Sequence, residues 1–213
     1  MNFLMLLLIF FTSFSFSSFI FSLNFSFASV SEYQLQLQWG TTGTENGQFM
    51  VPHSMAFDSA GNIYVTDVNN HRIQKFTSDG EFITKWGTEG NGDGQFNEPH
   101  SSIVDRFGNV FVSDMNNHRI QKFTSDGEFI TKWGTEGNGE GQFGLPLGIG
   151  SDSKGDIFII DQATSSIPQF SNQGQFINNI IFNFGKLEDI EIDSNDAIYV
   201  TDRNKNEILK FSK

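Results

Sequence analysis

The chain has 213 residues, and its 25 acidic and 13 basic side chains give a formal net charge of −12. This acidic balance argues against a protein that binds phosphate backbones, because such affinity comes from Lys and Arg side chains that release counterions. The absence of cysteine excludes disulfides, cysteine-ligated zinc and thiol nucleophiles.

The first 28 residues are predicted to be an export signal. No charged side chain precedes Glu32, and residues 5–11 form an apolar run of the length found in signal-peptide cores. Residues 26–28 (Ser-Phe-Ala) place small side chains at the −3 and −1 positions of a cleavage site. An uncleaved membrane anchor over residues 3–28 is the alternative, since about 20 apolar residues span a bilayer; a chain that is not exported is a third. We expect a secreted or extracytoplasmic protein, which contacts a membrane only if this segment is not cleaved.

An internal repeat begins at about residue 33. The segment Asn69–Gly87 recurs unchanged as Asn116–Gly134, 47 residues later. The same spacing separates Pro52, Pro99 and Pro146, and the last step, from Asp161 to Asp202, is 41 residues. Repeats of this length are typical of propeller blades and too long for leucine-rich repeats.

Each unit shows the two-residue periodicity of β-strands. In the first unit we expect strands at 54–58, 62–66, 72–76 and 81–86, with an Asp-Gly hairpin turn between the last two. Four strands make one blade of a β-propeller. Complete four-stranded antiparallel blades are therefore expected at 53–86, 100–133 and 147–180, and three strands of a fourth blade at 187–212.

The missing strand of the fourth blade is expected at the other end of the chain. Residues 33–39 align with the fourth strand of the first unit and are followed by the same Trp-Gly ending. Pairing of this N-terminal strand with the last blade would close a four-bladed ring over residues 33–213 and hide two sheet edges. The alternatives are an open arc that another chain completes, with self-association as a consequence, and a truncated gene.

At the start of each blade the sequence resembles a known repeat. The segment Pro52–Asp67, followed by Asn70-His71-Arg72, is similar to the NHL repeat, which is named for an Asn-His-Leu triplet. The triplet recurs as Asn-His-Arg at 117–119 and is replaced in the third and fourth units. The resemblance covers nearly all of residues 33–213 and implies a propeller that acts as a binding or scaffold module. NHL propellers usually have more blades than this chain supplies.

Two histidines are the candidate residues of a central site. His53 and His100 each follow a proline at the start of the innermost strand, so adjacent blades would place both imidazoles near the channel. Imidazole is a common metal ligand, but a stable zinc site needs three or four ligands. The third unit has Leu147 at this position, and the fourth unit has no histidine. Surface or structural histidines are therefore the expected interpretation, and zinc bound by His53 and His100 is the alternative.

A metal-dependent enzyme is the alternative function. The NHL resemblance extends to the peptidyl-hydroxyglycine amidating lyases, which are propeller enzymes with zinc bound by histidines and with catalytic Tyr and Arg residues. This chain lacks a third axial histidine and the cysteines of that branch. The resemblance therefore favours binding over catalysis, and we name no catalytic residue.

Polar residues recur after the second strand of each unit. The structural interpretation is that each aspartate accepts backbone N–H groups or pairs with Arg72 or Arg119. The functional interpretation is a set of carboxylates that attracts cations or a basic peptide. The third unit has no arginine or lysine there, so its aspartate is expected to be unpaired. The candidate ligand-binding residues of this set are Asp67, Asn70, Asp114, Asn117 and Asp161.

Two further patterns have structural and functional interpretations. The linkers 89–94 and 136–141 combine oxygen ligands with glycine, as calcium loops do, but their spacing matches no established loop. They also lack the lysine of a phosphate-binding loop. Trp39, Trp86 and Trp133 are expected to pack between blades, with an exposed sugar-binding band as the alternative.

The sequence predicts an exported NHL-type propeller that binds a protein or a cell-envelope glycan. We expect it to bind neither a cofactor nor nucleic acid. The ligand is expected on the loops at 67–71 and 114–118 or over the channel near the two candidate histidines. Zinc and calcium are the alternative cofactors.

Overall fold

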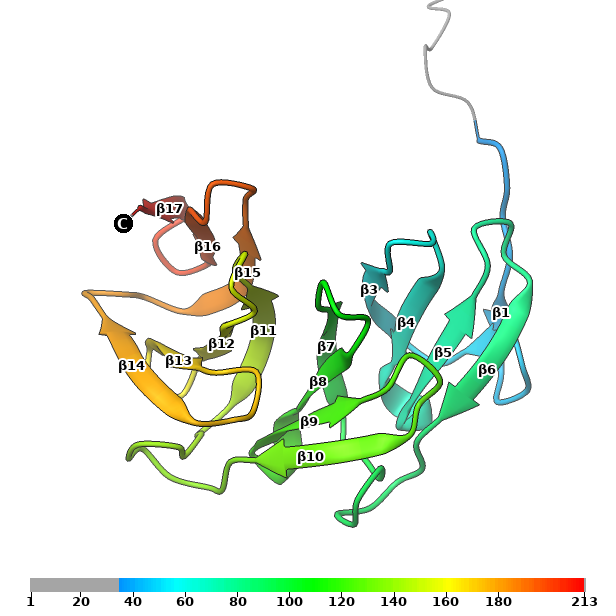
Figure 1. Cartoon of the computed structure of the whole chain (residues 1–213), viewed down its shortest axis with the longest axis horizontal. Coiled ribbons are helices and arrows are strands. Elements are labelled where there is room, and N and C mark those ends of the chain that lie inside the picture. The colour runs from blue at the N-terminus through cyan, green and yellow to red at the C-terminus, as the bar shows by residue number, and fades with distance from the viewer. Residues whose placement is uncertain (1–34, 213) are drawn as a thin grey trace, which may run out of the picture. The chain divides into compact units, whose positions relative to one another are not determined.

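The computed structural model describes residues 35–212 of the chain (Figure 1). The predicted export signal, and residues 33 and 34 of the predicted N-terminal strand, lie outside the described residues. The repeats belong to one compact unit, Gln36–Lys213. Among the described residues there is no helix with the length and apolar character needed to cross a membrane.

Three complete blades lie where the sequence predicted them (Figure 1). The first blade contains, from the centre outwards, β3 (Pro52–Phe57), β4 (Ile63–Asp67), β5 (Arg72–Phe76) and β6 (Phe82–Trp86). The second contains β7 (Pro99–Val104), β8 (Val110–Asp114), β9 (Arg119–Phe123) and β10 (Phe129–Trp133). The third contains β11 (Pro146–Ser151), β12 (Ile157–Asp161), β13 (Ser166–Phe170) and β14 (Phe176–Ile181). All neighbouring strands within these blades are antiparallel, so the predicted all-β propeller architecture is confirmed.

The fourth blade has three strands among the described residues. They are β15 (Leu187–Ile192), β16 (Ile198–Asp202) and β17 (Glu207–Phe211). A short parallel pair precedes the first blade and consists of β1 (Thr41–Thr42) and β2 (Gln48–Phe49). One-turn 3₁₀ segments, η1 (Val68–Asn70) and η2 (Met115–Asn117), connect the second and third strands of the first two blades.

The strands form because β-branched and aromatic residues fill the middle of each blade. Every residue of β4, β5, β8 and β9 is buried, whereas β6 and β10 alternate between partly buried and exposed residues. This difference follows from the architecture. The middle strands of the second blade are covered on both faces by neighbouring blades, those of the first blade are covered by the second blade and by Trp39 and Phe49, and the outer strands lie at the rim.

A tryptophan contact joins the segment before the first blade to that blade, and the same contact joins the first three blades in turn. The Trp39 ring lies 6.1 Å from the Phe76 ring, Trp86 lies 5.8 Å from Phe123, and Trp133 lies 5.9 Å from Phe170. In each case a tryptophan of one unit packs on the third strand of the next blade. The predicted packing of the tryptophans between blades is therefore confirmed.

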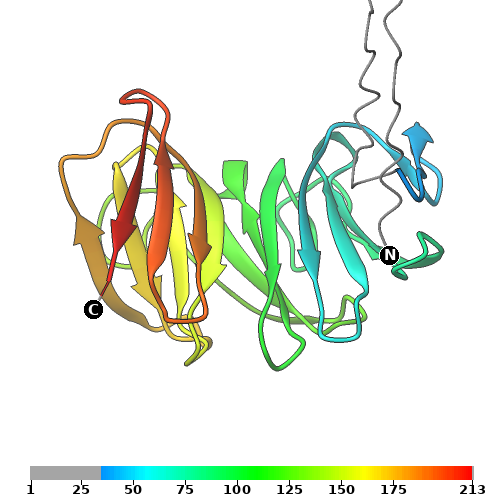
Figure 2. The same ribbon diagram turned by 90° about the horizontal axis from the view of Figure 1, so that it is seen from above.

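The predicted pairing of residues 33–39 with the last blade is wrong for its described part. Residues 36–39 belong to no strand, and β17 is the outer strand of a sheet that contains only β15, β16 and β17. Inner strands pack in chain order, β3 on β7, β7 on β11 and β11 on β15. Figures 1 and 2 show the first and last blades at opposite ends of an open arc. The physical reason is that Trp39, the aromatic residue of the predicted strand, packs on Phe76 of the first blade and so holds this segment against the first blade, not the last.

Candidate functional site

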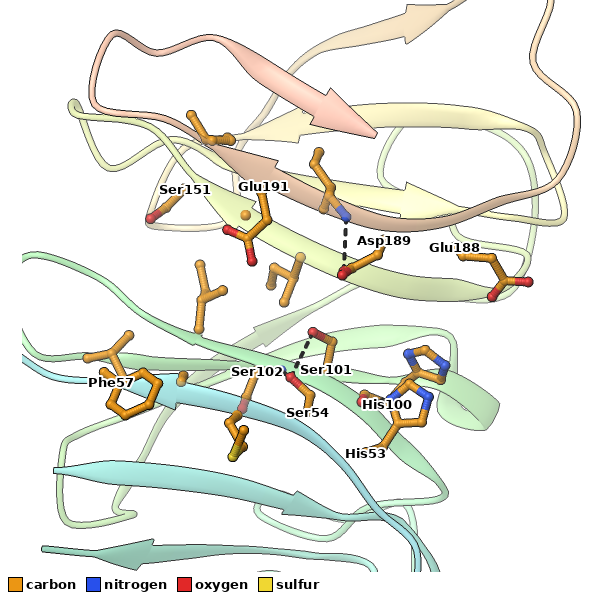
Figure 3. A pocket seen from close by; sticks show the side chains of 18 residues that line it. His53, Ser54, Phe57, His100, Ser101, Ser102, Ser151, Glu188, Asp189 and Glu191 are labelled. Atoms are coloured by element: carbon orange, nitrogen blue, oxygen red, sulfur yellow. Dashed lines mark hydrogen bonds between the residues drawn. The ribbon is translucent and has the colours of Figure 1, made fainter. Parts of the chain in front are cut away.

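A pocket of about 690 Å³ lies among the inner strands β3, β7, β11 and β15 (Figure 3). Its lining combines imidazole, carboxylate and hydroxyl groups with apolar side chains. Because every blade contributes its innermost strand to this pocket, the propeller architecture itself creates the site. The residues that determine its chemistry are His53, His100, Ser101, Asp189 and Glu191.

The two candidate histidines lie side by side, as the sequence predicted. Their ring centroids are 4.0 Å apart, and Nδ1 of His53 lies 3.1 Å from the carbonyl oxygen of His100. Nδ1 of His100 is buried and has no hydrogen-bond partner among the described residues. Burial, and then the neighbouring His53, lower the pKa of His100 to about 4, against an opposing effect of Glu188. The His100 ring is therefore neutral at pH 7.

The opposite wall of the pocket is acidic (Figure 3). β15 contributes Glu188, Asp189 and Glu191, and the last two are exposed to solvent. Burial, and then the charge of Asp189, raise the pKa of Glu191. The Glu188 carboxylate pairs with exposed Arg203 at 3.2 Å. Asp189 and Glu191 are thus the carboxylates that no cationic side chain among the described residues neutralises.

The repeat contained a signal for this acidic wall that the sequence prediction missed. Successive offsets of 47, 47 and 41 residues carry His53 to His100, Leu147 and Glu188. Glu188 therefore occupies the position of the two histidines in the fourth blade. The sequence prediction considered only histidines at this position and therefore did not include Glu188.

Hydroxyl groups and apolar side chains complete the lining. Ser54 Oγ lies 3.3 Å from Ser101 Oγ, and Thr66 donates to Ser102 Oγ at 3.0 Å. At the other end of the pocket from the histidines, Phe57 is 61% exposed. The pocket therefore offers an apolar surface within reach of its carboxylates.

The zinc alternative has two of its ligands in place. His53 and His100 come together from β3 and β7, but no group of three or more His, Asp or Glu side chains in the described part of the chain could hold a metal. A zinc site needs at least three protein ligands. Zinc at the two histidines stays a prediction.

The aspartates at the ends of β4 and β8 lie in the interior. Asp67 and Asp114 are 0% exposed, and their carboxylates pair with Arg72 at 2.8 Å and Arg119 at 2.7 Å. This confirms the structural interpretation of the first two aspartates. A ligand in solvent does not reach these carboxylates.

Asn70 and Asn117 belong to the same interior network. Asn70 donates to Asp67 Oδ2 at 2.8 Å and to the carbonyl of Gly43, and Asn117 donates to Asp114 Oδ2 at 2.9 Å. Both amides therefore tie the turn after the second strand to the strand itself.

The side chains of Arg72 and Arg119 also donate hydrogen bonds to the linkers that precede their blades. Arg119 donates to the carbonyl oxygens of Asn91, Gly92 and Gln95 at 2.7, 2.9 and 2.8 Å. Arg72 makes the same contacts with the linker before the first blade. The oxygen cluster for which calcium was the alternative is thus filled by a guanidinium group in the linker 89–94. The sequence analysis identified both the arginine and the glycine-rich linker, but it did not predict the hydrogen bonds between them.

Asp161 differs from the first two aspartates, as predicted. It is 1% exposed, and its carboxylate accepts the backbone N–H groups of Gly144 and Leu145 at 2.9 and 2.8 Å. No Lys, Arg or His in the described part of the chain forms an ion pair with it.

The comparisons with known proteins agree with this architecture. The family model of the NHL repeat matches residues 49–76. The human NHL repeat-containing protein 3 is 47% identical over 45 residues, which is 21% of this chain and 13% of that protein. The B-box type zinc finger protein ncl-1 of Caenorhabditis elegans is 44% identical over 45 residues, 21% of this chain and 5% of that protein. The chain therefore contains a segment, residues 49–76, that matches the NHL repeat.

Solved structures resemble the NHL repeats in fold. A nidogen/laminin complex matches with a TM-score of 0.61 at 20% identity, over 80% of this chain and 62% of that chain. Virginiamycin B lyase from Staphylococcus aureus matches with a TM-score of 0.59 at 16% identity, over 76% of this chain and 55% of that chain. The chain thus spans about half to three fifths of these structures and a small part of the curated relatives.

Proposed function

We propose that this NHL propeller is a non-catalytic binding module, and that its ligand is a polypeptide that places a basic side chain in the pocket of the inner strands. The observation that carries the proposal is the acidic wall formed by Asp189 and Glu191, which faces hydroxyl groups and a neutral imidazole across the pocket. A nidogen/laminin complex among the structural neighbours shows that this type of fold occurs in a protein complex.

The chemistry of the lining favours a long basic side chain. An ammonium or guanidinium head would gain charge-assisted hydrogen bonds from the carboxylates of β15. Its aliphatic stem would pack on Phe57 and Met55, both of which are exposed. The net charge of −12 would also speed the encounter with a basic partner, and added salt would slow it.

A polypeptide is favoured over a cell-envelope glycan. Sugar rings are usually bound by exposed aromatic faces, and Trp39, Trp86 and Trp133 pack against the neighbouring blades instead. A glycan remains the alternative ligand. Among the residues that line the pocket, the exposed Phe57 is the phenyl ring on which a sugar could pack.

The test is a binding measurement with a labelled oligolysine peptide, with an oligoglutamate peptide as comparison. We expect the double variant Asp189→Asn with Glu191→Gln to bind oligolysine about five- to tenfold more weakly, because two half-solvated charge contacts are lost. The matched control is Glu81→Gln with Glu128→Gln, which removes two exposed carboxylates away from the pocket. Equal weakening in both double variants would refute the pocket as the site, since only the net charge would then matter.

A lyase is the second candidate function. Virginiamycin B lyase, crystallised also in a catalytically inactive form with quinupristin, and streptogramin B lyase share the fold. The adjacent imidazoles of His53 and His100 are the groups that would support such chemistry. Breakdown of quinupristin, followed by mass spectrometry and lost in both His53→Ala and His100→Ala, would favour catalysis. An intact substrate would favour binding.

We propose in addition that residues 1–28 direct export of the propeller. The support is the uncharged apolar run and the small residues before the predicted cleavage site. A mature protein that begins at residue 29, found by N-terminal sequencing of the extracytoplasmic fraction, is the expected result, whereas an intact N-terminus in the membrane fraction would indicate the anchor.

A further inference from the structure

The third blade keeps the loop that holds an arginine in the first two blades, but it lacks the arginine. Ser166 stands where the earlier blades have Arg72 and Arg119, because it pairs with Asp161 across the hairpin as Arg119 pairs with Asp114. Two residues further on, Pro168 replaces the glutamine that also bonds to the loop carbonyl and the aspartate. The cationic and amide donors of the second blade are therefore missing from these two positions of the third blade.

The loop itself has the same conformation in the second and third blades. Gly137 has φ 149°, the same value as Gly90. Gln142 accepts the N–H of Gly139 at 3.0 Å, as Gln95 accepts the N–H of Gly92 at 3.0 Å. A parallel bridge closes each loop, between residues 136 and 143 and between residues 89 and 96. The loop thus keeps its shape without the guanidinium group that crosses it in the second blade.

A pocket of about 440 Å³ lies at this position. We call it the third-blade pocket. The residues that line it include Asn138, Gly139, Gln142, Asp161, Ser166 and Asn179, and Glu140, Thr164 and Asn178 also contribute polar groups. The first three residues correspond to those whose carbonyl oxygens accept from Arg119 in the second blade. The replacement of one arginine by serine has therefore produced a pocket lined by hydrogen-bond acceptors.

Two further acceptors line the third-blade pocket. The buried Asp161 carboxylate accepts the N–H groups of Gly144 and Leu145, but it has no cationic partner in the described part of the chain. The Oδ1 atom of Asn179 is buried without a hydrogen-bond partner among these residues. Unsatisfied buried acceptors cost free energy, and a bound donor would remove that cost.

We propose that the third-blade pocket binds the guanidinium group of an arginine on a partner polypeptide. A guanidinium group is planar and carries five N–H donors in a fixed fork, which suits several carbonyl oxygens and a carboxylate at once. The same acceptor set already binds a guanidinium group twice in this molecule, at Arg72 and Arg119. Ile181 lines the pocket and is 74% exposed, so it offers an apolar contact for the arginine stem.

The test uses the peptides Gly-Arg-Gly and Gly-Lys-Gly, free L-arginine and calcium as probes, with binding followed by NMR titration. We expect Gly-Arg-Gly to bind and Gly-Lys-Gly to bind about tenfold more weakly, because an ammonium group cannot make the forked contacts. Free L-arginine should bind more weakly than the arginine peptide, since it lacks the peptide groups that can contact the rim of the pocket.

The variant Ser166→Arg fills the third-blade pocket from within. It should abolish binding of Gly-Arg-Gly and raise the melting temperature, as an internal arginine restores the contacts of the second blade. Gln173→Arg is the matched control: it adds the same charge on the exposed turn between β13 and β14, and it should leave binding unchanged. Asn179→Leu keeps the branch at Cγ but removes the Oδ1 acceptor, together with the Nδ2 donor to Ser166, and it should weaken binding about threefold or more even if Ser166→Arg fails to fold.

Four results would overturn the proposal. They are the absence of arginine-peptide binding, equal binding of the lysine peptide, a tighter response to calcium than to arginine, and unchanged binding in both Ser166→Arg and Asn179→Leu. Tighter binding of free L-arginine than of the peptide would show that the ligand is the free amino acid and not a polypeptide. None of these results bears on the pocket of the inner strands, which other residues line.

Discussion

In each of the first two blades, one buried arginine both pairs with an aspartate and binds the preceding linker. Arg119 neutralises the buried Asp114, donates to three carbonyl oxygens of the preceding linker, and thereby ties that linker to its blade. Its side chain is 7% exposed, so its charge is balanced inside the protein and not by water. A buried ion pair costs free energy to desolvate, and its loss is costly when one partner remains alone.

We predict that Arg119→Met destabilises the protein by about 3–5 kcal/mol, because it leaves Asp114 buried without a countercharge. Chemical denaturation followed by tryptophan fluorescence measures this change. The control is Arg106→Met, which makes the same substitution at an exposed arginine of the same blade and should change stability by less than about 0.5 kcal/mol. Equal effects of the two substitutions would show that the ion pair contributes no more than a surface charge.

The ion pairs within a blade could be predicted from the residue types at repeat positions, but the contacts between a linker and its blade could not. The pairing of Asp67 with Arg72, and the lack of a basic partner for Asp161, follow from residue types at repeat positions. The carboxylates of β15 are found only once the offset to the shorter fourth unit is applied. That Arg119 reaches the linker carbonyls depends on the turn of the linker over the blade, which no residue type specifies.

At the scale of the element, each hairpin between the third and fourth strands is shaped by a tryptophan of the preceding unit. Gly127 has φ 87°, a conformation that side chains rarely adopt, and a Cβ atom added there would lie 2.5 Å from the Trp86 ring. Gly80 and Gly174 have the same relation to Trp39 and Trp133. The glycine of each turn therefore serves both the hairpin and the contact with the tryptophan.

We predict that Gly127→Ala destabilises the protein by about 1–3 kcal/mol more than Gly108→Ala does, because only the first also collides with a packed ring. Gly108 is a matched control: its φ is 82°, and nothing lies within 4 Å of a Cβ atom built there. Thermal unfolding of both variants separates the steric cost from the backbone cost. Equal losses would mean that the tryptophan moves aside without cost.

At the scale of the whole molecule, the strands and blades could be predicted but the closure could not. Period-two patterns and turn residues identify each strand, because these signals are local. Ring closure depends on the rotation between blades, which accumulates over every junction and has no local signal. The Trp-Gly pattern at residues 39–40 predicted a strand that pairs with the last blade, whereas Trp39 packs against Phe76 of the first blade and belongs to no strand.

The open arc leaves β17 without an outer partner among the described residues, and Ile208 on this strand is 72% exposed. Such an edge pairs readily with another chain, and head-to-tail contacts of this kind build rings or filaments. We therefore predict that residues 29–213, which contain the compact unit, self-associate as concentration rises, as light scattering would show. Ile208→Lys, a charge on this edge, should restore the monomer, whereas Ile130→Lys on the rim strand β10 should not. A monomer of the unaltered chain at every concentration would show that the edge is protected in solution.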